Sequence, residues 1–281
     1  MNLIERPREM QECSLKLRRE GRRIGLVPTM GFLHEGHAAL IRRARTLADW
    51  CVVSVFVNPT QFGPHEDFTA YPRDPQRDAE LCRACGADAL FRPAAADMYA
   101  ADHSVYVDER DLSAGLCGAF RPGHFRGVLT VVAKLFNLVQ PDVAVFGQKD
   151  AQQARLIQRL VRDLNFPVHV VIEPTVREPD GLALSSRNAY LNADERRRAL
   201  SLSQALRRAE ALVREGERDA ERLKAAMRPI LEAAAPTEIQ YLEIVNYQTL
   251  RPTPQVAGPT LIAVAVKFGK TRLIDNVIVG R

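Results

Sequence analysis

The sequence of 281 residues lacks an apolar run long enough to cross a membrane. Its longest apolar stretches, at residues 51–57 and 261–266, are far shorter than the roughly 20 residues that a membrane-spanning helix needs. The N-terminus contains no apolar core of a secretion signal and leads after Pro7 into a charged segment of helical character. We therefore expect a cytoplasmic protein with no membrane partner.

Cysteine is scarce, and its spacing is not that of a disulfide framework. The five cysteines are an odd number, which favours free thiols in a reducing compartment. Cys82 and Cys85 form one CxxC pair, but a zinc site would need a second pair, and Cys13, Cys51 and Cys117 are isolated. We expect Cys82 and Cys85 to lie on a buried helix face, so cysteine spacing predicts no metal site.

Lysine is also rare, so the net charge of +5 comes mostly from arginine. The arginines are scattered and alternate with acids, as at residues 194–198 and 214–218, and few aromatic residues lie among them. A nucleic-acid surface would instead cluster basic and aromatic side chains. Solvated helix faces explain these charge runs better, and we expect no nucleic-acid partner.

Segments of strand character alternate with amphipathic segments in the first half of the chain. This alternation predicts βαβ units and an α/β fold with a parallel sheet. Ligands of such folds gather at the carboxyl ends of the strands, so the loops after Val27, Val57, Phe146 and Ile172 are candidate binding loops. The predicted strands are residues 24–27, 52–57, 87–91, 143–146 and 168–172, and the predicted helices are residues 36–49, 75–85, 125–139 and 150–164.

The second half changes character after about residue 177. A run of helices followed by a run of strands indicates a smaller α+β domain, and residues 268–272 fit a hairpin turn. We therefore predict two domains, residues 1–176 and residues 177–281. The predicted helices of the second domain are residues 194–215 and 220–234, and its predicted strands are residues 239–245, 260–268 and 272–279.

The stretch His34-Glu35-Gly36-His37 stands where the first predicted strand gives way to a helix. His34 and His37 would share one face of the first helical turn. The unpaired backbone N–H groups and the positive end of the helix dipole bind anions there, and Gly36 lets a phosphate approach the backbone. The spacing alone fits two surface histidines beside a turn equally well.

Polar side chains follow the other predicted strands as well. Gln61 offers both a donor and an acceptor to a small polar substrate, and Lys149 provides a point charge suited to phosphate. Ser185, Ser186 and Arg187 add two hydroxyls and a guanidinium. Each group alone is common on protein surfaces, but their occurrence at the same end of one inferred sheet favours a shared site for a phosphorylated ligand.

Six sequence blocks occur in a fixed order across the chain. They are PTMGFLHEGH at residues 28–37, FVNPTQF at 56–62, YPR at 71–73, RPGHFRGV at 121–128, FGQKD at 146–150 and LSSRN at 184–188. Together they resemble the pantothenate synthetase family, the pantoate:β-alanine ligases, and the C-terminal part also matches that family in length and pattern. The resemblance implies a Rossmann-like catalytic domain of the HxGH nucleotidyltransferase superfamily. A smaller C-terminal lid domain with a three-stranded antiparallel sheet would follow it.

The resemblance also implies a two-step ligation in pantothenate (vitamin B5) and coenzyme A biosynthesis. ATP and pantoate first give pantoyl adenylate and pyrophosphate, and β-alanine then attacks the adenylate to release pantothenate and AMP. Mg²⁺ would be held mainly through the ATP phosphates, with no protein metal site, and the enzyme would be a homodimer. Asp78 and Glu80 are interpreted as helix-surface acids rather than metal ligands.

Residue roles follow from the same resemblance. His37, His34 and Lys149 would be catalytic, with His37 as proton donor. Gln61 would bind both pantoate and β-alanine, and Gln153 would bind pantoate. The residues expected to bind ATP are Met30, Gly31, Phe32, Leu33, His34, Glu35, Gly36, His37, Gly147, Gln148, Lys149, Asp150, Val176, Leu184, Ser185, Ser186 and Arg187.

The sequence departs from the family pattern at two positions, and two alternative functions must be compared with the ligase. The family often has glutamate at the position of Gln148 and methionine at that of Leu184, and neither residue is assigned to the chemistry. A plain nucleotidyltransferase would share the histidine pair but would not explain Gln61 and Gln153. A nucleic-acid or regulatory binding module would need the clustered arginines that the sequence lacks.

Overall fold

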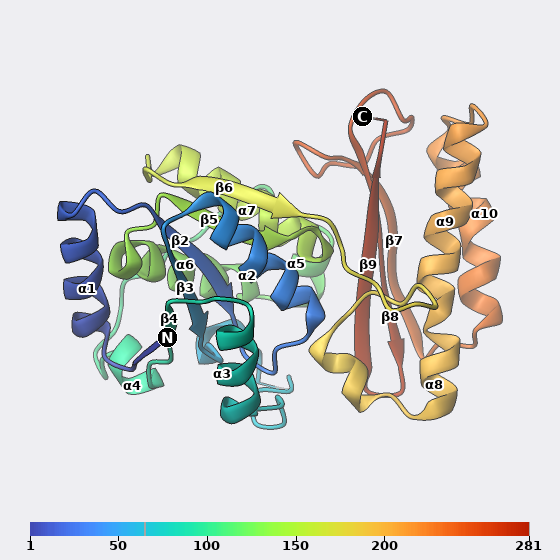
Figure 1. The fold of residues 1–281 in the computed structure, drawn as a ribbon. Helices are drawn as coiled ribbons and strands as arrows, with labels where there is room; N and C mark the ends of the chain where they lie inside the picture. Colours follow the sequence, from blue (N-terminus) through green and yellow to red (C-terminus); the bar gives the residue numbers. More distant parts are fainter. Residues whose placement is uncertain (65, 281) are drawn as a thin grey trace. The chain divides into compact units, whose positions relative to one another are not determined.

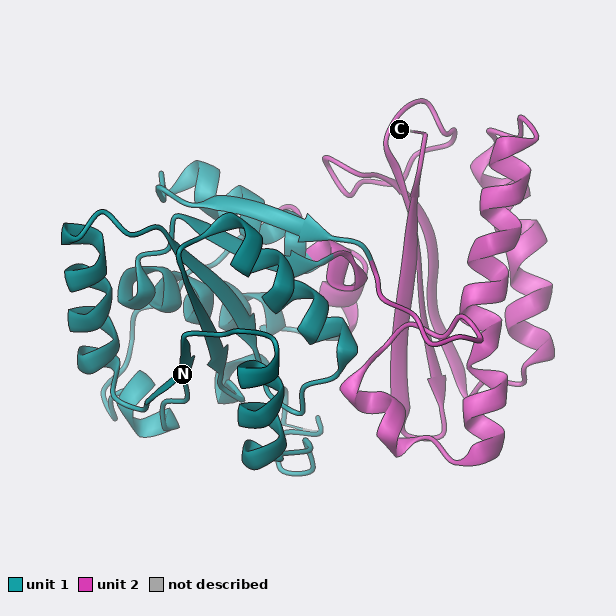
Figure 2. Cartoon of the chain, in the orientation of Figure 1, with its two compact units in different colours: residues 1–110, 121–147, 153–174 teal, residues 111–120, 148–152, 175–281 magenta. Residues whose placement is uncertain are grey.

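The computed structural model describes residues 1–64 and 66–280 (Figure 1). The chain forms two compact units (Figure 2). Two short segments that precede the predicted domain boundary, residues 111–120 and 148–152, belong to unit 2, and the division at residue 176 stays a prediction. Unit 1 comprises Met1–Arg110, Arg121–Gly147 and Gln153–Pro174, and unit 2 comprises Asp111–Phe120, Gln148–Gln152 and Thr175–Arg281.

Unit 1 is built around a six-stranded sheet in which every strand pair is parallel. This confirms the predicted α/β class, although the short edge strand β1 was not predicted. Its three residues carry too little apolar pattern to be recognised, and they are held by pairing with β4. The strands are β1 (Asn2–Ile4), β2 (Ile24–Thr29), β3 (Trp50–Val55), β4 (Ala89–Phe91), β5 (Val143–Gly147) and β6 (His169–Glu173).

Helices cover both faces of this sheet (Figure 1). Helix α2 lies in front of the sheet, and α6 lies behind it, where α6 also packs against α1. Because α6 packs against β2, α1 and the turn at residues 59–61, most of its residues are buried, including Leu129, Val132 and Phe136. The main helices are α1 (Pro7–Arg19), α2 (Glu35–Leu47), α3 (Pro75–Ala84), α6 (His124–Val139) and α7 (Ala151–Asp163), and the short ones are α4 (Ala95–Met98) and the 3₁₀ turn η1 (Pro59–Gln61).

The strand order β1-β4-β3-β2-β5-β6 has its switch point between β2 and β5. From β2 the chain builds outward through β3 and β4, whereas β5 and β6 add to the other side of β2. In open α/β sheets, ligands bind at the carboxyl ends of the strands beside such a switch point. The loops that follow β2 and β5 carry the histidine pair and Lys149, respectively.

Unit 2 contains an antiparallel sheet of order β7-β8-β9, as predicted. The two-residue turn Gly269-Lys270 joins β8 to β9, because Phe268 pairs directly with Thr271. Helices α9 and α10 pack on one face of the sheet over buried residues such as Leu242, Ile262 and Val264. The strands are β7 (Glu238–Asn246), β8 (Thr260–Phe268) and β9 (Thr271–Val279), the helices are α5 (Cys117–Phe120), α8 (Ala193–Arg198), α9 (Leu200–Arg214) and α10 (Ala220–Ala233), and the 3₁₀ turns are η2 (Gln148–Asp150) and η3 (Ser186–Tyr190).

One long helix was predicted over residues 194–215, and this prediction is wrong. The segment forms α8 and α9, which are separated at Ala199. The Leu202 amide donates to the Ala199 carbonyl only three residues earlier, so the chain tightens at this point. Arg198 also donates to the Ala235 carbonyl, 2.7 Å away. No proline or glycine marks the break, which is why the sequence did not reveal it.

The cysteines are free and do not form a metal site among the described residues. Cys82 and Cys85 are buried at the end of α3, in the core that α3 shares with α2, as predicted. Burial raises the pKa of the Cys82 thiol to about 12, which keeps it protonated and unreactive. Within residues 1–64 and 66–280, no helix is long and apolar enough to cross a membrane.

Candidate active site

The two histidines of the HxGH stretch cap the N-terminus of α2 together. His34 is the N-cap, and its Nδ1 accepts from the Gly36 backbone N–H at 3.1 Å. His37 reaches back, and its Nδ1 accepts from the His34 backbone N–H at 3.3 Å. The ring centroids are 4.1 Å apart. This is a capping box made of imidazoles instead of a hydroxyl and a carboxylate, and it confirms that both rings share the first turn.

The capping box fixes the orientation of both rings. Because each Nδ1 accepts a hydrogen bond, the neutral ring carries its proton on Nε2. Each Nε2–H therefore points away from the helix backbone and is a donor suited to a phosphate oxygen. The positive end of the helix dipole adds to the attraction for an anion.

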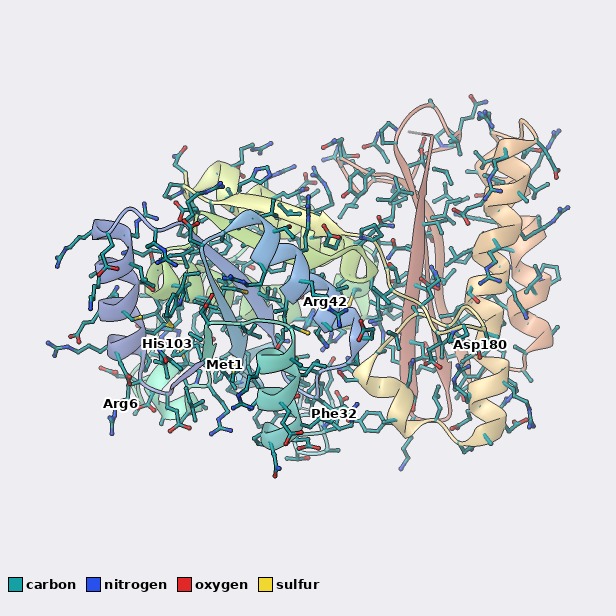
Figure 3. All side chains as sticks on the ribbon, viewed as in Figure 1. Met1, Arg6, Phe32, Arg42, His103 and Asp180 are labelled. Atoms are coloured by element: carbon teal, nitrogen blue, oxygen red, sulfur yellow. The ribbon has the colours of Figure 1, made fainter. Side chains whose placement is uncertain are left out.

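Asp78 holds the loop that leads into this helix. The backbone N–H groups of Leu33 and Phe32 donate to its carboxylate at 2.6 and 3.0 Å. These bonds stabilise left-handed backbone at Gly31 (φ 87°) and Phe32 (φ 52°), a conformation that costs phenylalanine roughly 1–2 kcal/mol. Figure 3 labels the Phe32 side chain in this loop, and the Arg77 guanidinium lies 5.4 Å from its ring centroid.

The prediction that Asp78 is a helix-surface acid is therefore wrong. Its side chain is 2% exposed, because the loop before α2 folds over the start of α3. Burial raises the pKa of Asp78, and the Leu33 and Phe32 N–H groups act in the opposite direction by stabilising the charged form. Helical periodicity placed Asp78 on an outer face, since it contained no information about a loop 45 residues earlier in the chain.

Gln61 lies beside the histidine loop in unit 1. Its side-chain Nε2 contacts the Met30 Sδ at 2.9 Å, and its Oε1 accepts from Asn58 Nδ2 at 3.1 Å. Gln61 is 7% exposed. A carboxamide has two N–H donors and two acceptor lone pairs. These two contacts therefore orient the Gln61 amide and use half of its hydrogen-bonding capacity. Two side chains that the sequence predicted for one site, Met30 and Gln61, are thus in contact.

Asn58 fixes the turn that carries Gln61. It is 1% exposed, and its Oδ1 accepts from the Tyr99 hydroxyl and the Thr60 hydroxyl, both at 2.9 Å. Its Nδ2 donates to the Gly127 carbonyl at 3.1 Å as well as to Gln61. With both ends of the amide bonded, Asn58 has one possible orientation, and η1 is held to α6.

A second network holds the Gln61 backbone. Arg121 pairs with Glu66 through two short contacts, 2.7 and 2.5 Å, and its third nitrogen lies 3.0 Å from His124 Nε2. The arginine can only donate, so His124 carries its proton on Nδ1 and donates it to the Gln61 carbonyl at 2.8 Å. Burial alone would raise the pKa of Glu66, but the Arg121 hydrogen bonds and charge outweigh it and lower that pKa.

Gly127 lets α6 approach η1 closely, and we expect Gly127→Ala to be destabilising. A Cβ at this position would lie 2.6 Å from the Gln61 backbone nitrogen and would overlap the Thr60 carbonyl. Overpacking of this kind costs about 1–3 kcal/mol, and it would displace η1, which carries Gln61. Denaturant titration should show the loss of stability as a lower free energy of unfolding.

Gly115→Ala is the matched control, because no atom lies within 4 Å of a Cβ built at Gly115. We expect its free energy of unfolding to stay near the wild-type value. Wild-type stability in Gly127→Ala would contradict the close packing of α6 on η1.

Lys149 lies in unit 2, on the 3₁₀ turn η2 that follows β5. Its side chain is 21% exposed, and its Nζ lies 3.9 Å from the carboxylate of Asp150. The carbonyl oxygens of Gln148 and Lys149 accept from Asn276 Nδ2 of β9 at 3.0 and 2.9 Å. The backbone of η2 is therefore fixed, while the Lys149 ammonium extends from it as a flexible point charge.

The predicted ATP residues at 176–187 form a short hairpin-like loop in unit 2. Arg177 bridges to Ala183, and the Leu184 N–H donates to the Val176 carbonyl at 3.0 Å. Ser185 caps η3 by accepting from the Arg187 N–H at 3.3 Å. On the outer side of the loop, Asp180, labelled in Figure 3, lies 2.8 Å from Arg196 of α8.

The structure thus groups the predicted site residues into two sets. Unit 1 contains the histidine loop, Gln61 and Gly147, together with Gln153, which is partly buried on α7. Unit 2 contains residues 148–150 and the loop at residues 176–187. Gln152, the neighbour of Gln153, has a structural role, because it is buried and its amide is hydrogen-bonded to the backbone of Leu112, Gly115 and Cys117.

Sequence reasoning missed the residues that hold these groups in place. From the sequence, Asn58 could be recognised only as an amide in a loop beside a proline. Asp78 could be recognised only as an acid on a helix, although it is buried. A stronger signal was the pair Asp275-Asn276 in the middle of the last predicted strand, because aspartate and asparagine are depleted in strands. His124 and Arg121 lay within a recognised block but had no predicted role.

The parallel sheet, its switch point and a histidine-capped helix after β2 define a Rossmann-like α/β protein. The model of the pantoate-beta-alanine ligase family matches residues 2–278, and the chain belongs to that family. It is therefore an enzyme, a ligase of pantothenate biosynthesis.

Known proteins are similar in sequence to this chain over nearly its whole length. The pantothenate synthetase of Heliobacterium modesticaldum is 56% identical over 279 residues, covering 99% of each chain. That of Thermotoga petrophila is 53% identical over 280 residues, covering 100% of each chain. The crystal structure of pantothenate synthetase from Thermus thermophilus is 46% identical, covers 99% of each chain and has a TM-score of 0.94.

A further solved structure is described with ligands. The pantoate-beta-alanine ligase of Francisella tularensis, complexed with beta-gamma ATP and beta-alanine, is 32% identical to this chain and has a TM-score of 0.82. The match covers 99% of this chain and 97% of that one.

Proposed function

We propose that the protein condenses pantoate with β-alanine at the expense of ATP, through a pantoyl adenylate, and releases AMP and pyrophosphate. Family membership supports the overall reaction, and the ATP and β-alanine complex of the Francisella tularensis enzyme supports two of the substrates. Within the structure, the contact between Met30 and Gln61 carries the proposal. It joins the loop expected to bind ATP to the residue expected to bind pantoate.

The first step needs a carboxylate and an α-phosphorus held together. Gln61 would orient pantoate through its remaining amide donor and acceptor, and Gln153 would bind the same substrate. The pantoate carboxylate would attack the α-phosphorus, and the bond from that phosphorus to the leaving pyrophosphate would break. His34 and His37 would donate Nε2–H groups to phosphate oxygens, whose charge grows in the transition state.

Unit 2 would supply the groups for the outer phosphates. Lys149 would neutralise charge on the transferring and leaving phosphates, and Ser185, Ser186 and Arg187 would contact the outer phosphate oxygens. The other predicted ATP residues, including Asp150 near the ribose, would bind the nucleotide without taking part in the chemistry.

Mg²⁺ is proposed to arrive with ATP, bound through the β and γ phosphate oxygens, and to neutralise part of their charge. This mode keeps several water ligands and needs few protein ligands. The described residues contain no group of three or more histidine, cysteine, aspartate or glutamate side chains that could hold a metal, and a nucleotide-borne ion does not require one.

The second step starts from an activated acyl group. The β-alanine amine would attack the acyl carbon of pantoyl adenylate, form the amide bond and release AMP. Holding the amine close to that carbon supplies much of the acceleration, and Gln61 is proposed to help position β-alanine. The homodimer expected from the family resemblance stays a prediction.

The test measures AMP and pyrophosphate from protein mixed with ATP, Mg²⁺ and defined acids. AMP should appear only when pantoate and β-alanine are both present, and pantoate alone should give at most one pyrophosphate per active site. Pyrophosphate release that requires a different acceptor, with no pantothenate formed, would instead favour a plain nucleotidyltransferase.

A further inference from the structure

Two neighbouring polar residues, Asp275 and Asn276, lie in the middle of β9. Both are 3% exposed, although most residues around them in the strand are apolar. Consecutive side chains of a strand point to opposite faces of the sheet. Asp275 is paired with Val264, which belongs to the core beneath α9 and α10, and Asn276 is paired with Ala263. The two side chains therefore act on different parts of unit 2.

Asn276 holds the segment that carries Lys149. Its Nδ2 donates to two consecutive carbonyl oxygens, that of Gln148 at 3.0 Å and that of Lys149 at 2.9 Å. Its Oδ1 lies 3.5 Å from the Gln148 side-chain Nε2. A group bonded to both carbonyls defines the direction of the peptide between them, and hence the direction in which the Lys149 side chain leaves the backbone.

Asp275 holds the loop at residues 176–187. Its two oxygens form a bidentate pair with Arg177, at 2.6 and 2.9 Å. Arg177 also donates to the Gly181 carbonyl at 3.1 Å, which closes the loop whose far end carries Ser185. Asp275 accepts in addition from the Asn276 backbone N–H at 2.8 Å, so the two anchors are themselves connected.

We propose that Asn276 is a positioning residue for Lys149, and that the pair Asp275-Asn276 sets the separation between the two phosphate-binding segments of unit 2. The inference rests on the proposed function, because it assigns Asn276 to the step in which Lys149 acts. The physical reason is that a lysine stem has several rotatable bonds, so only a fixed backbone can return its ammonium to the same place in each turnover.

The experiment separates the two half-reactions in Asn276→Ala. Adenylate formation is measured as pantoate-dependent exchange of pyrophosphate into ATP, and the second half-reaction as pantothenate formation from supplied pantoyl adenylate and β-alanine. We expect the kcat of the first to fall about 10- to 100-fold, since small displacements of a catalytic group cost rates of this order. The KM for pantoate and the rate of the second half-reaction should each change less than about twofold, because Gln61 and Gln153 belong to unit 1.

A double-mutant cycle with Lys149→Ala distinguishes positioning from general damage. If Asn276 acts through Lys149, adding Asn276→Ala to Lys149→Ala should slow the first half-reaction little further. The control is Asn246→Ala, at the end of β7, because the Asn246 side chain bonds only nearby backbone and Thr249 among the contacts of the described residues. The Asn246→Ala variant should carry out both half-reactions at wild-type rates.

The outcomes separate the inference from the function on which it rests. Equal losses in both half-reactions, multiplicative effects in the cycle, or an unaffected Asn276→Ala would each overturn the positioning role. A wild-type protein without exchange activity would instead overturn the proposed function. Should Asn276→Ala not fold, the nearly isosteric Asn276→Asp replaces it. Its carboxylate has no N–H for the Gln148 and Lys149 carbonyls, so the same selective loss is expected.

Discussion

Lys149→Ala should reduce the rate of pantoyl adenylate formation by about 100- to 1,000-fold, the range seen when one preorganised group is removed from a transition-state site. The effect should fall on this step because charge builds on the phosphate oxygens there. Pantoate binding should weaken much less, since its proposed ligands Gln61 and Gln153 lie in unit 1. Pantoate-dependent pyrophosphate exchange gives the rate, and equilibrium titration gives the pantoate affinity.

Lys270→Ala is the matched control for Lys149→Ala. Lys270 is an exposed lysine of the same unit, in the turn between β8 and β9. Its removal changes the net charge equally, so unspecific electrostatic attraction of ATP falls by a similar amount. We expect wild-type exchange rates from Lys270→Ala. Adenylate formation at a near wild-type rate in Lys149→Ala would show that the lysine has no role in this step.

His34→Asn should lower adenylate formation by about 100-fold while leaving the protein as stable as the wild type. Asparagine is among the best N-cap residues, so its side-chain oxygen can accept from Gly36 N–H in place of the imidazole. What the substitution removes is the Nε2–H donor proposed to bind a phosphate. Thermal melting gives the stability, and pyrophosphate exchange gives the rate.

His34→Ala provides the comparison, because it removes the cap as well as the ring. Loss of an N-cap typically costs about 1 kcal/mol, so this variant should melt at a lower temperature than His34→Asn and be equally slow. If His34→Asn exchanged pyrophosphate as fast as the wild type, the histidine pair would serve only to cap α2.

Much of the fold could be predicted because each main element has its own local signal. The strands around β2, β3 and β5 are apolar runs, and α6 and α7 have clear helical stripes, so they differ from prediction by only a few residues. Elements defined by tertiary contact were missed. Strand β1 exists through its pairing with β4, and the division between α8 and α9 depends on a local tightening at Ala199 that no proline or glycine marks.

The site shows a similar division between what the sequence revealed and what it did not. The histidine pair and Gln61 could be proposed because their residue types and loop positions are suited to substrates, and Met30 proves to lie against Gln61. Asp78 and Asn276 act on carbonyl and N–H groups of segments far away in the sequence. A periodic pattern describes the face of an element but contains no information about which distant backbone it meets.

The hydrogen bonds of Asn276 also bear on when the enzyme becomes active during its synthesis. They join residues 127 and 128 positions apart, and β9 follows every other described strand in the sequence. Ribosomal synthesis proceeds from the N-terminus, and the sheet of unit 1 can form before β9 has emerged. The segment around Lys149 acquires its anchor only when β9 has been made. A chain truncated before β9 can therefore contain every proposed substrate-binding residue and still hold its lysine on an unanchored turn.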